Sequence, residues 1–154
     1  MPSLPQTVHL GFGSNLGDRE ASYRQSIKKL GSTTGVKIAR FSSLLENPPM
    51  GPPQPDYLNG VIEISTTLSP HDLLEQLQLI ETKMGRTRDV VWGPRTVDLD
   101  ILFWGSKILD SDDLKIPHPG ACERRFVLEP LAEIAPDIID PRSGRIISEI
   151  LETL

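Results

Sequence analysis

The sequence is poor in the residues that mark several classes of protein. It has one cysteine, Cys122, in 154 residues, which excludes an internal disulfide framework and a multi-cysteine metal site. Lysine and arginine together number 16 against 21 acidic residues, for a net charge of −5. This acidic balance argues against a nucleic-acid or anionic-membrane partner, which would require a basic surface.

Long apolar runs and targeting signals are missing as well. No segment approaches the roughly 20 apolar residues that a membrane-spanning helix needs. The first residues, M-P-S-L-P-Q-T-V, carry neither the basic region nor the apolar stretch of a secretory signal. We therefore expect a cytoplasmic protein that forms a single domain over residues 1–154 and acts as a monomer.

Aromatic side chains are scarce, at 5% of the chain, so the position of each ring is informative. Tyr57 and Phe126 fall outside the apolar stripes expected to form the core. Tyr57 follows a proline-rich stretch, and Phe126 follows a pair of arginines. Four other rings fit core stripes: Phe12, Tyr23, Phe41 and Phe103.

Periodicity predicts four strands and two capped helices. The strands are expected over Val8–Phe12, Val36–Leu45, Tyr57–Thr67 and Val97–Trp104. The helices follow the N-cap residues Asp18 and Ser69, and Gly31 and Gly85 are expected to end them. A C-terminal extension is expected to add a short strand within Ile108–Leu114 and helices over Val127–Ala135 and Ile146–Leu154.

The order β-α-β-β-α-β is typical of an α+β, ferredoxin-like split sandwich. In that architecture both helices cover one face of a mainly antiparallel sheet. The other face is expected to be left to loops, which could build a site there.

Two segments rich in glycine or proline adjoin the strands. Gly11–Gly17 lacks the lysine of a Walker A loop and the spacing of a dinucleotide fingerprint, so it is interpreted as a tight strand-to-helix turn. Five of the eight residues from Pro48 to Pro55 are proline. They predict a stiff, extended loop that is either a plain connector or one wall of a pocket.

The segment with the most chemical content is Trp92–Ile101, W-G-P-R-T-V-D-L-D-I. Asp98 and Asp100 share one face of the expected strand. Neighbouring carboxylates on an apolar strand repel each other and lose hydration, and a divalent cation relieves both effects. Their oxygen ligands favour Mg²⁺ shared with substrate phosphates. The plain alternative is a half-exposed strand with two solvated acids. The opposite face of the strand takes Val97, Leu99, Ile101 and Phe103.

Arginines lie just upstream of these carboxylates. Arg86 and Arg88 belong to an aperiodic loop over Gly85–Pro94, and Arg95 directly precedes the strand. Guanidinium groups bind phosphate oxygens in bidentate geometry, so arginines beside metal-binding carboxylates are typical of phosphoryl transfer. A loop of this length is also a candidate for a mobile lid.

Other polar residues allow simpler interpretations. His9, inside the first strand, is expected to be a satisfied structural histidine, and His71 an exposed residue of a first helical turn. Gln78 and Glu81 lie beside Leu74 on the second helix. There they are either solvated surface or, beside a pocket, hydrogen-bonding groups for a ligand.

Together these motifs resemble those of one family, the 6-hydroxymethyl-7,8-dihydropterin pyrophosphokinases of folate biosynthesis. The resemblance runs over nearly the whole chain, and W-G-P-R-x-x-D-x-D with P-D-Y-L-N is its most specific part. It rests on Gly13–Gly17, Pro48–Gly51, Gln54–Asn59, Gly85–Arg88, Trp92–Ile101, Ile116–Pro119 and Arg124–Leu128.

The resemblance implies transfer of a pyrophosphoryl group from ATP to the pterin hydroxymethyl oxygen, with release of AMP. It implies that Asp98 and Asp100 hold two Mg²⁺ ions, and that Arg86 and Arg95 join them as catalytic residues. The implied ATP contacts are Leu74, Gln78, Glu81, Arg88, Arg95, Ile101, His118 and Arg124. The implied pterin contacts are Asn47, Pro48, Met50, Tyr57, Asn59 and Phe126.

The pterin contacts also have a physical argument. A flat heterocycle with a polar edge needs two apolar faces and a hydrogen-bonding rim. The rings of Tyr57 and Phe126 offer the faces, and Asn59 with nearby backbone offers the rim. The alternative is that both rings merely cap the core.

Four positions depart from the family's pattern. Val91 stands where a basic residue is frequent, and Pro119 where some members have an aromatic. Asp113 occupies a position that is basic in some members, and Asn47 replaces a common threonine. Each departure bears on a nucleotide or pterin contact, and none removes an expected metal ligand or stacking ring.

Two other functions remain open at this point. A non-catalytic, ferredoxin-like ligand-binding module explains the fold pattern but leaves the D-x-D carboxylates and the arginines without a role. A metal-dependent phosphohydrolase would use the same metals with water as the nucleophile.

Overall fold

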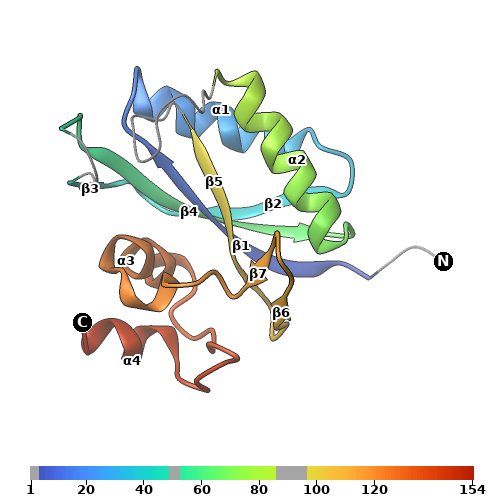
Figure 1. Ribbon diagram of the computed structural model, residues 1–154, viewed down its shortest axis with the longest axis vertical. Coiled ribbons are helices and arrows are strands. Elements are labelled where there is room, and N and C mark those ends of the chain that lie inside the picture. The colour runs from blue at the N-terminus through green and yellow to red at the C-terminus, as the bar shows by residue number, and fades with distance from the viewer. Residues whose placement is uncertain (1–3, 49–52, 86–96) are drawn as a thin grey trace.

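The structure is a computed structural model that describes residues 4–48, 53–85 and 97–154. It is an α+β fold with helices on both faces of one main sheet (Figure 1). The elements, in chain order, are β1 (Gln6–Ser14), α1 (Arg19–Gly31), β2 (Val36–Phe41), β3 (Leu45–Asn47), β4 (Tyr57–Thr66), α2 (Pro70–Lys83), β5 (Asp98–Trp104), β6 (Leu109–Asp110), β7 (Lys115–Ile116), the 3₁₀ turn η1 (Ala121–Glu123), α3 (Arg125–Ile134) and α4 (Ile147–Glu152). No helix in these described ranges is long and apolar enough to cross a membrane.

The main sheet is antiparallel, with strand order β2-β4-β1-β5, and β3 also pairs with β4. The four predicted strands appear as β1, β2, β4 and β5. The range predicted as one strand, Val36–Leu45, is divided, because β2 ends at Phe41 and β3 begins at Leu45. β3 extends to Asn47, so the chain pairs with the start of β4 where a loop was expected.

Local sequence signals account for the two helices on the first face. Asp18 and Ser69 each accept a hydrogen bond from the backbone N–H three residues later, which confirms both predicted N-caps. Gly85 follows the C-cap Met84 of α2 and has a φ of +87°, as expected of a glycine that ends a helix. Gly31 ends α1 as its last helical residue, but Ser32 is the C-cap, so the expectation that Gly31 is the capping glycine is wrong.

Apolar side chains form two clusters, one on each face of the sheet. The first packs α1 and α2 onto the sheet, through residues such as Leu10, Leu30 and Leu77. The second packs β4 and β5 against α3 and α4, through residues such as Val61 and Leu128. Figure 1 shows α1 and α2 above the sheet, and α3 and α4 below it. The expectation that loops alone occupy the second face is therefore wrong.

β5 changes its pattern partway along. Its pairing with β1 shifts register between His9 and Leu10, which leaves Leu102 without a partner in the ladder. A bulge of this kind interrupts the alternation of side chains. Leu99 stays in the first cluster, whereas Leu102 and Phe103 both join the second. The prediction that Phe103 shares a face with Leu99 is therefore wrong.

Three further predictions differ from the structure in detail. Phe41, predicted to lie in the core, is 53% exposed, because its ring meets Tyr23 edge-on at the outer strand and leaves its other side to solvent. The strand expected within Ile108–Leu114 is only β6, which pairs with β7. The two C-terminal helices are present, but α3 starts earlier than predicted and α4 is shorter.

Candidate active site

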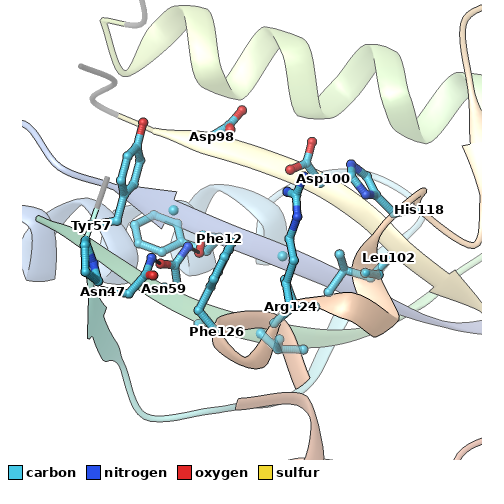
Figure 2. A pocket seen from close by; sticks show the side chains of 17 residues that line it. Phe12, Asn47, Tyr57, Asn59, Asp98, Asp100, Leu102, His118, Arg124 and Phe126 are labelled. Atoms are coloured by element: carbon cyan, nitrogen blue, oxygen red, sulfur yellow. Dashed lines mark hydrogen bonds between the residues drawn. The ribbon is translucent and has the colours of Figure 1, made fainter. Parts of the chain in front are cut away.

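A cavity of about 200 Å³ lies on the second face of the sheet, beside η1 and α3. Its walls come from the glycine-containing part of β1, from β3, β4 and β5, and from the segment between β7 and α3. Figure 2 shows side chains from these separate segments around one space. The predicted site residues that line it are Asn47, Pro48, Tyr57, Asn59, Asp98, Asp100, His118, Arg124 and Phe126.

Asp98 and Asp100 are half-buried on the same face of β5, as predicted, and both line the cavity. In the neighbouring strand β1, Gly13 lies opposite Asp98 and Gly11 opposite Asp100. A Cβ added to Gly13 would lie 3.0 Å from the amide nitrogen of Asn59. The two glycines therefore keep open the space beside the carboxylates.

The role of these glycines was not predicted from the sequence, because the strand was expected to end at Phe12 within a tight turn over Gly11–Gly17. β1 continues to Ser14, so the turn interpretation is wrong for Gly13 and Ser14. After the strand, Asn15 donates hydrogen bonds to Gln54 Oε1 at 2.7 Å and to the carbonyl of Pro55 at 2.9 Å. These bonds anchor one end of the proline-rich segment, and Pro48 near its other end lines the cavity. The pocket-wall interpretation is therefore favoured over a plain connector. The alternating G-x-G could have been recognised as strand positions facing a cavity.

The two carboxylates suit a hard cation that takes its remaining ligands from water and substrate. Both are half-buried on one strand face and both line the cavity. Within residues 4–48, 53–85 and 97–154, no group of three or more His, Cys, Asp and Glu side chains is placed to hold a metal ion. The donor set fits Mg²⁺ shared with phosphates better than a structural metal held by protein alone.

Glu81 is not the solvated helix residue that was one interpretation of it. It is 2% exposed, and its carboxylate accepts a 2.7 Å hydrogen bond from the backbone N–H of Leu99. Leu99 stands between the two aspartates, and β5 is an edge strand, so its outer backbone groups need partners other than a strand. Glu81 supplies one such partner, and it thereby links α2 to the carboxylate strand.

The other predicted nucleotide residues near α2 do not line the cavity. Leu74 packs against the first cluster, and Gln78 is exposed on α2. Ile101 is 3% exposed within the same cluster. Their nucleotide contacts, and that of Glu81, stay predictions. Four predicted site residues lie outside the described residues: Met50, Arg86, Arg88 and Arg95.

His118 and Arg124 bring nitrogen-bearing side chains to the cavity from the segment before α3, and Arg124 extends toward Asp100 (Figure 2). The Nδ1 of His118 donates to the carbonyl of Pro119 at 2.8 Å, which leaves Nε2 as the acceptor nitrogen of the neutral ring. Burial lowers the pKa of His118 below 6.5, although the bond to Pro119 opposes the shift. Arg124 is therefore the fixed positive charge of this pair.

Two half-buried rings and two amides form another part of the cavity wall. Tyr57 comes from the start of β4 and Phe126 from the first turn of α3; both are half-buried, and neither belongs to an apolar cluster. The guanidinium carbon of Arg124 lies 5.9 Å from the centre of the Phe126 ring. Asn47 and Asn59 form a hydrogen-bonded amide pair beside Tyr57 (Figure 2).

The other two histidines are not part of the site, as expected. His9 is 3% exposed, and its Nε2 lies 2.9 Å from Glu63, which also pairs with Arg40. His71 is exposed in the first turn of α2 and lies 3.0 Å from Asp113.

Comparison with known proteins identifies the family. The model of 7,8-dihydro-6-hydroxymethylpterin-pyrophosphokinase (HPPK) matches residues 9–136. A 2-amino-4-hydroxy-6-hydroxymethyldihydropteridine pyrophosphokinase of Synechocystis is 46% identical over 152 residues, which cover 97% of this chain and 78% of the relative. A protein of the same name from Bacillus subtilis is 45% identical over 132 residues, which cover 85% of this chain and 79% of the relative.

Solved structures agree on the fold. Wild-type HPPK-DHPS of Plasmodium falciparum superimposes with a TM-score of 0.76 at 14% sequence identity. The match covers 97% of this chain but 41% of that one, so the chain spans less than half of the solved protein. From the family match and the sequence relatives together, this chain belongs to the 7,8-dihydro-6-hydroxymethylpterin-pyrophosphokinase family.

Proposed function

We propose that this chain transfers a pyrophosphoryl group from ATP to the hydroxymethyl group of 6-hydroxymethyl-7,8-dihydropterin, giving AMP and the pterin diphosphate. The observation that carries the proposal is a single cavity in which two aromatic rings and an amide pair lie beside the carboxylates of Asp98 and Asp100. Binding groups for a flat heterocycle and for the metal of a nucleotide thus share one space. Membership of the family supports the same reaction and makes the chain a transferase of folate biosynthesis.

The pterin would lie between Tyr57 and Phe126. Each ring offers an apolar face, and Asn59 offers amide hydrogen bonds at the edge of the heterocycle. Backbone groups around Asn47, Pro48 and Met50 would contact the same edge. Held in this way, the hydroxymethyl oxygen is oriented before reaction, which lowers the entropy cost of the transfer.

Asp98 and Asp100 are the residues that would hold Mg²⁺, and we propose that two ions would bind there together with the nucleotide. Bound there, Mg²⁺ would neutralise phosphate charge and make the pterin hydroxyl a better nucleophile. The contribution of the chain itself is the fixed placement of two carboxylates on one strand. The edge of that strand is held by Glu81.

Cationic side chains would bind the rest of the triphosphate. Arg124 extends into the cavity, and Arg86, Arg88 and Arg95 would add guanidinium groups from the segment before β5. His118 would donate to a phosphate oxygen only when protonated, because its Nδ1 hydrogen is already bonded to a carbonyl. A neighbouring polyanion favours that form. The nucleoside would meet α2 and β5 through Leu74, Gln78, Glu81 and Ile101.

The test is product analysis with ATP, Mg²⁺ and the hydroxymethyl dihydropterin, with each omitted in turn. The proposal requires AMP and the pterin diphosphate to appear only when all three are present. ATP turnover without pterin would instead support the phosphohydrolase. Binding without turnover in the complete mixture would support the non-catalytic module.

The finer structural assignments are part of the same proposal. We assign the fold to the ferredoxin-like class. The strand order supports this assignment, as do α1 and α2, which connect successive strands of the main sheet. We also propose that residues 1–154 act as one domain, as a monomer and in the cytoplasm. Gel filtration with light scattering tests the monomer, and limited proteolysis tests the single domain.

A further inference from the structure

The amide pair in the cavity has a defined hydrogen-bond direction. Asn47 ends β3, and its Nδ2 donates to Oδ1 of Asn59 at 2.7 Å. The Nδ2 of Asn59 in turn points to the carbonyl of Phe12, at 3.4 Å. Both asparagines line the cavity next to Tyr57 (Figure 2).

These contacts determine which end of the Asn59 amide faces which neighbour. The oxygen and nitrogen ends of an asparagine amide have nearly the same shape, so sterics alone do not choose between them. If the Asn59 amide were turned over, its NH₂ group would face the NH₂ group of Asn47. Its oxygen would also face the carbonyl of Phe12. Both observed contacts would be replaced by repulsive ones, so the pair selects one orientation.

We propose that Asn47 is a positioning residue, whose side chain fixes the Asn59 amide for recognition of the pterin edge. The inference rests on the proposed function. There, only backbone groups near Asn47 contact the pterin, and the role added here belongs to the Asn47 side chain. With Asn47 in place, Asn59 keeps one N–H and one oxygen lone pair at set positions facing the ligand. Without it, only the 3.4 Å contact with the carbonyl of Phe12 favours this orientation, so Asn59 presents donor and acceptor in the wrong places part of the time.

Asn47→Leu and Asn47→Asp are the test variants, because both preserve the approximate size of asparagine and remove the donated hydrogen. We expect each to weaken binding of 6-hydroxymethyl-7,8-dihydropterin about tenfold, or about 1.4 kcal/mol. The measurement is calorimetric titration of the pterin in the presence of a saturating, non-hydrolysable ATP analogue. Binding of the ATP analogue itself should be unchanged, which also verifies that each variant is folded.

A double-mutant cycle separates positioning from direct contact or general packing. If Asn47 acts through Asn59, then Asn47→Leu costs nothing further once Asn59→Leu is present. Losses that add, or pterin affinity that is unchanged in both Asn47 variants, would overturn the proposal. If Asn47→Leu also loses the ATP analogue, the cycle is decided with Asn47→Asp instead. A wild-type protein that fails to bind the pterin would refute the proposed function rather than the role of Asn47.

Discussion

Replacing Glu81 by leucine should lower the stability of the protein, because Glu81 is the hydrogen-bond partner of a buried group on an edge strand. Leucine is similar in size but offers no acceptor, so the N–H of Leu99 loses its 2.7 Å bond. An unsatisfied buried donor costs about 1–3 kcal/mol. For a chain of this size each kcal/mol shifts the unfolding midpoint by about 2–4 °C. We therefore expect the midpoint to fall by about 4–8 °C for a loss of about 2 kcal/mol.

The same substitution should lower turnover beyond its effect on stability. Leu99 lies between the two predicted metal ligands, and misplacing reacting groups by roughly 1 Å can cost about a hundredfold in rate. Turnover is measured well below the unfolding midpoint, so that every variant is folded. Glu81→Gln retains a carbonyl oxygen as acceptor and should recover most of both losses.

Glu75→Leu is the matched control, since Glu75 is exposed on the same helix. It should change the unfolding free energy by no more than about 0.5 kcal/mol. If the Glu81→Leu protein has the same unfolding midpoint as the wild type, the hydrogen bond to Leu99 is not important for stability. A protein that is destabilised but turns over normally would refute the link between that bond and the aspartates.

Three other predictions address the carboxylates, the rings and a buried histidine. Asp98→Ala and Asp100→Ala should each reduce steady-state turnover by orders of magnitude with an unchanged circular dichroism spectrum, because losing one anion relieves repulsion of the other. Tyr57→Ala and Phe126→Ala should weaken pterin binding tenfold or more in calorimetry, at ~1–3 kcal/mol per stack, and spare the ATP analogue; equal losses for both ligands contradict this. Burial lowers the pKa of His9 below 6.5, so as the pH falls His9 is protonated in the unfolded chain before it is protonated in the folded protein. Its contribution to stability should be complete above pH 6.5 and decline as the pH falls toward the folded pKa. When unfolding midpoints are measured from about pH 8 to 5, this dependence on pH should be present in the wild type and absent from His9→Gln.

The parts of the fold that sequence predicts well are those determined by local pattern. Asp18 and Ser69 start helices because a side-chain oxygen next to free backbone N–H groups is a local signal. Asp98 and Asp100 share a face because strand alternation has a period of two. These features need no knowledge of distant neighbours.

The features that the sequence did not reveal depend on neighbours that are distant in sequence. Phe103 changes face because of a bulge in the pairing of β5 with β1, and no residue within β5 signals it. Glu81 is polar on a helix flank, so only the position of β5 makes it a buried acceptor. Phe41 is apolar on a strand pattern, but it lies on an outer strand with one side open.

Part of the predicted set of site residues lines one cavity, but the geometry of that cavity was not predictable from the sequence. Resemblance named Tyr57 and Phe126, which come from segments separated by much of the chain and meet at one cavity. It named Gly13 only as part of a motif and did not name Gly11, so it did not show that these glycines keep the space beside the carboxylates open. Nor did it give the direction of the hydrogen bond within the amide pair that includes Asn59.

The cavity lies where two separately packed parts of the chain meet, the sheet with its first cluster and the α3–α4 layer with its second. A ligand that touches walls from both parts can bind fully only while they are docked. At a free ligand concentration of 100 times Kd, binding would stabilise the docked state by about 2.7 kcal/mol. Amide hydrogens of α3 should then exchange with solvent more slowly when both substrates are bound. Substrate occupancy and the docking of the C-terminal helices are linked equilibria, and each strengthens the other.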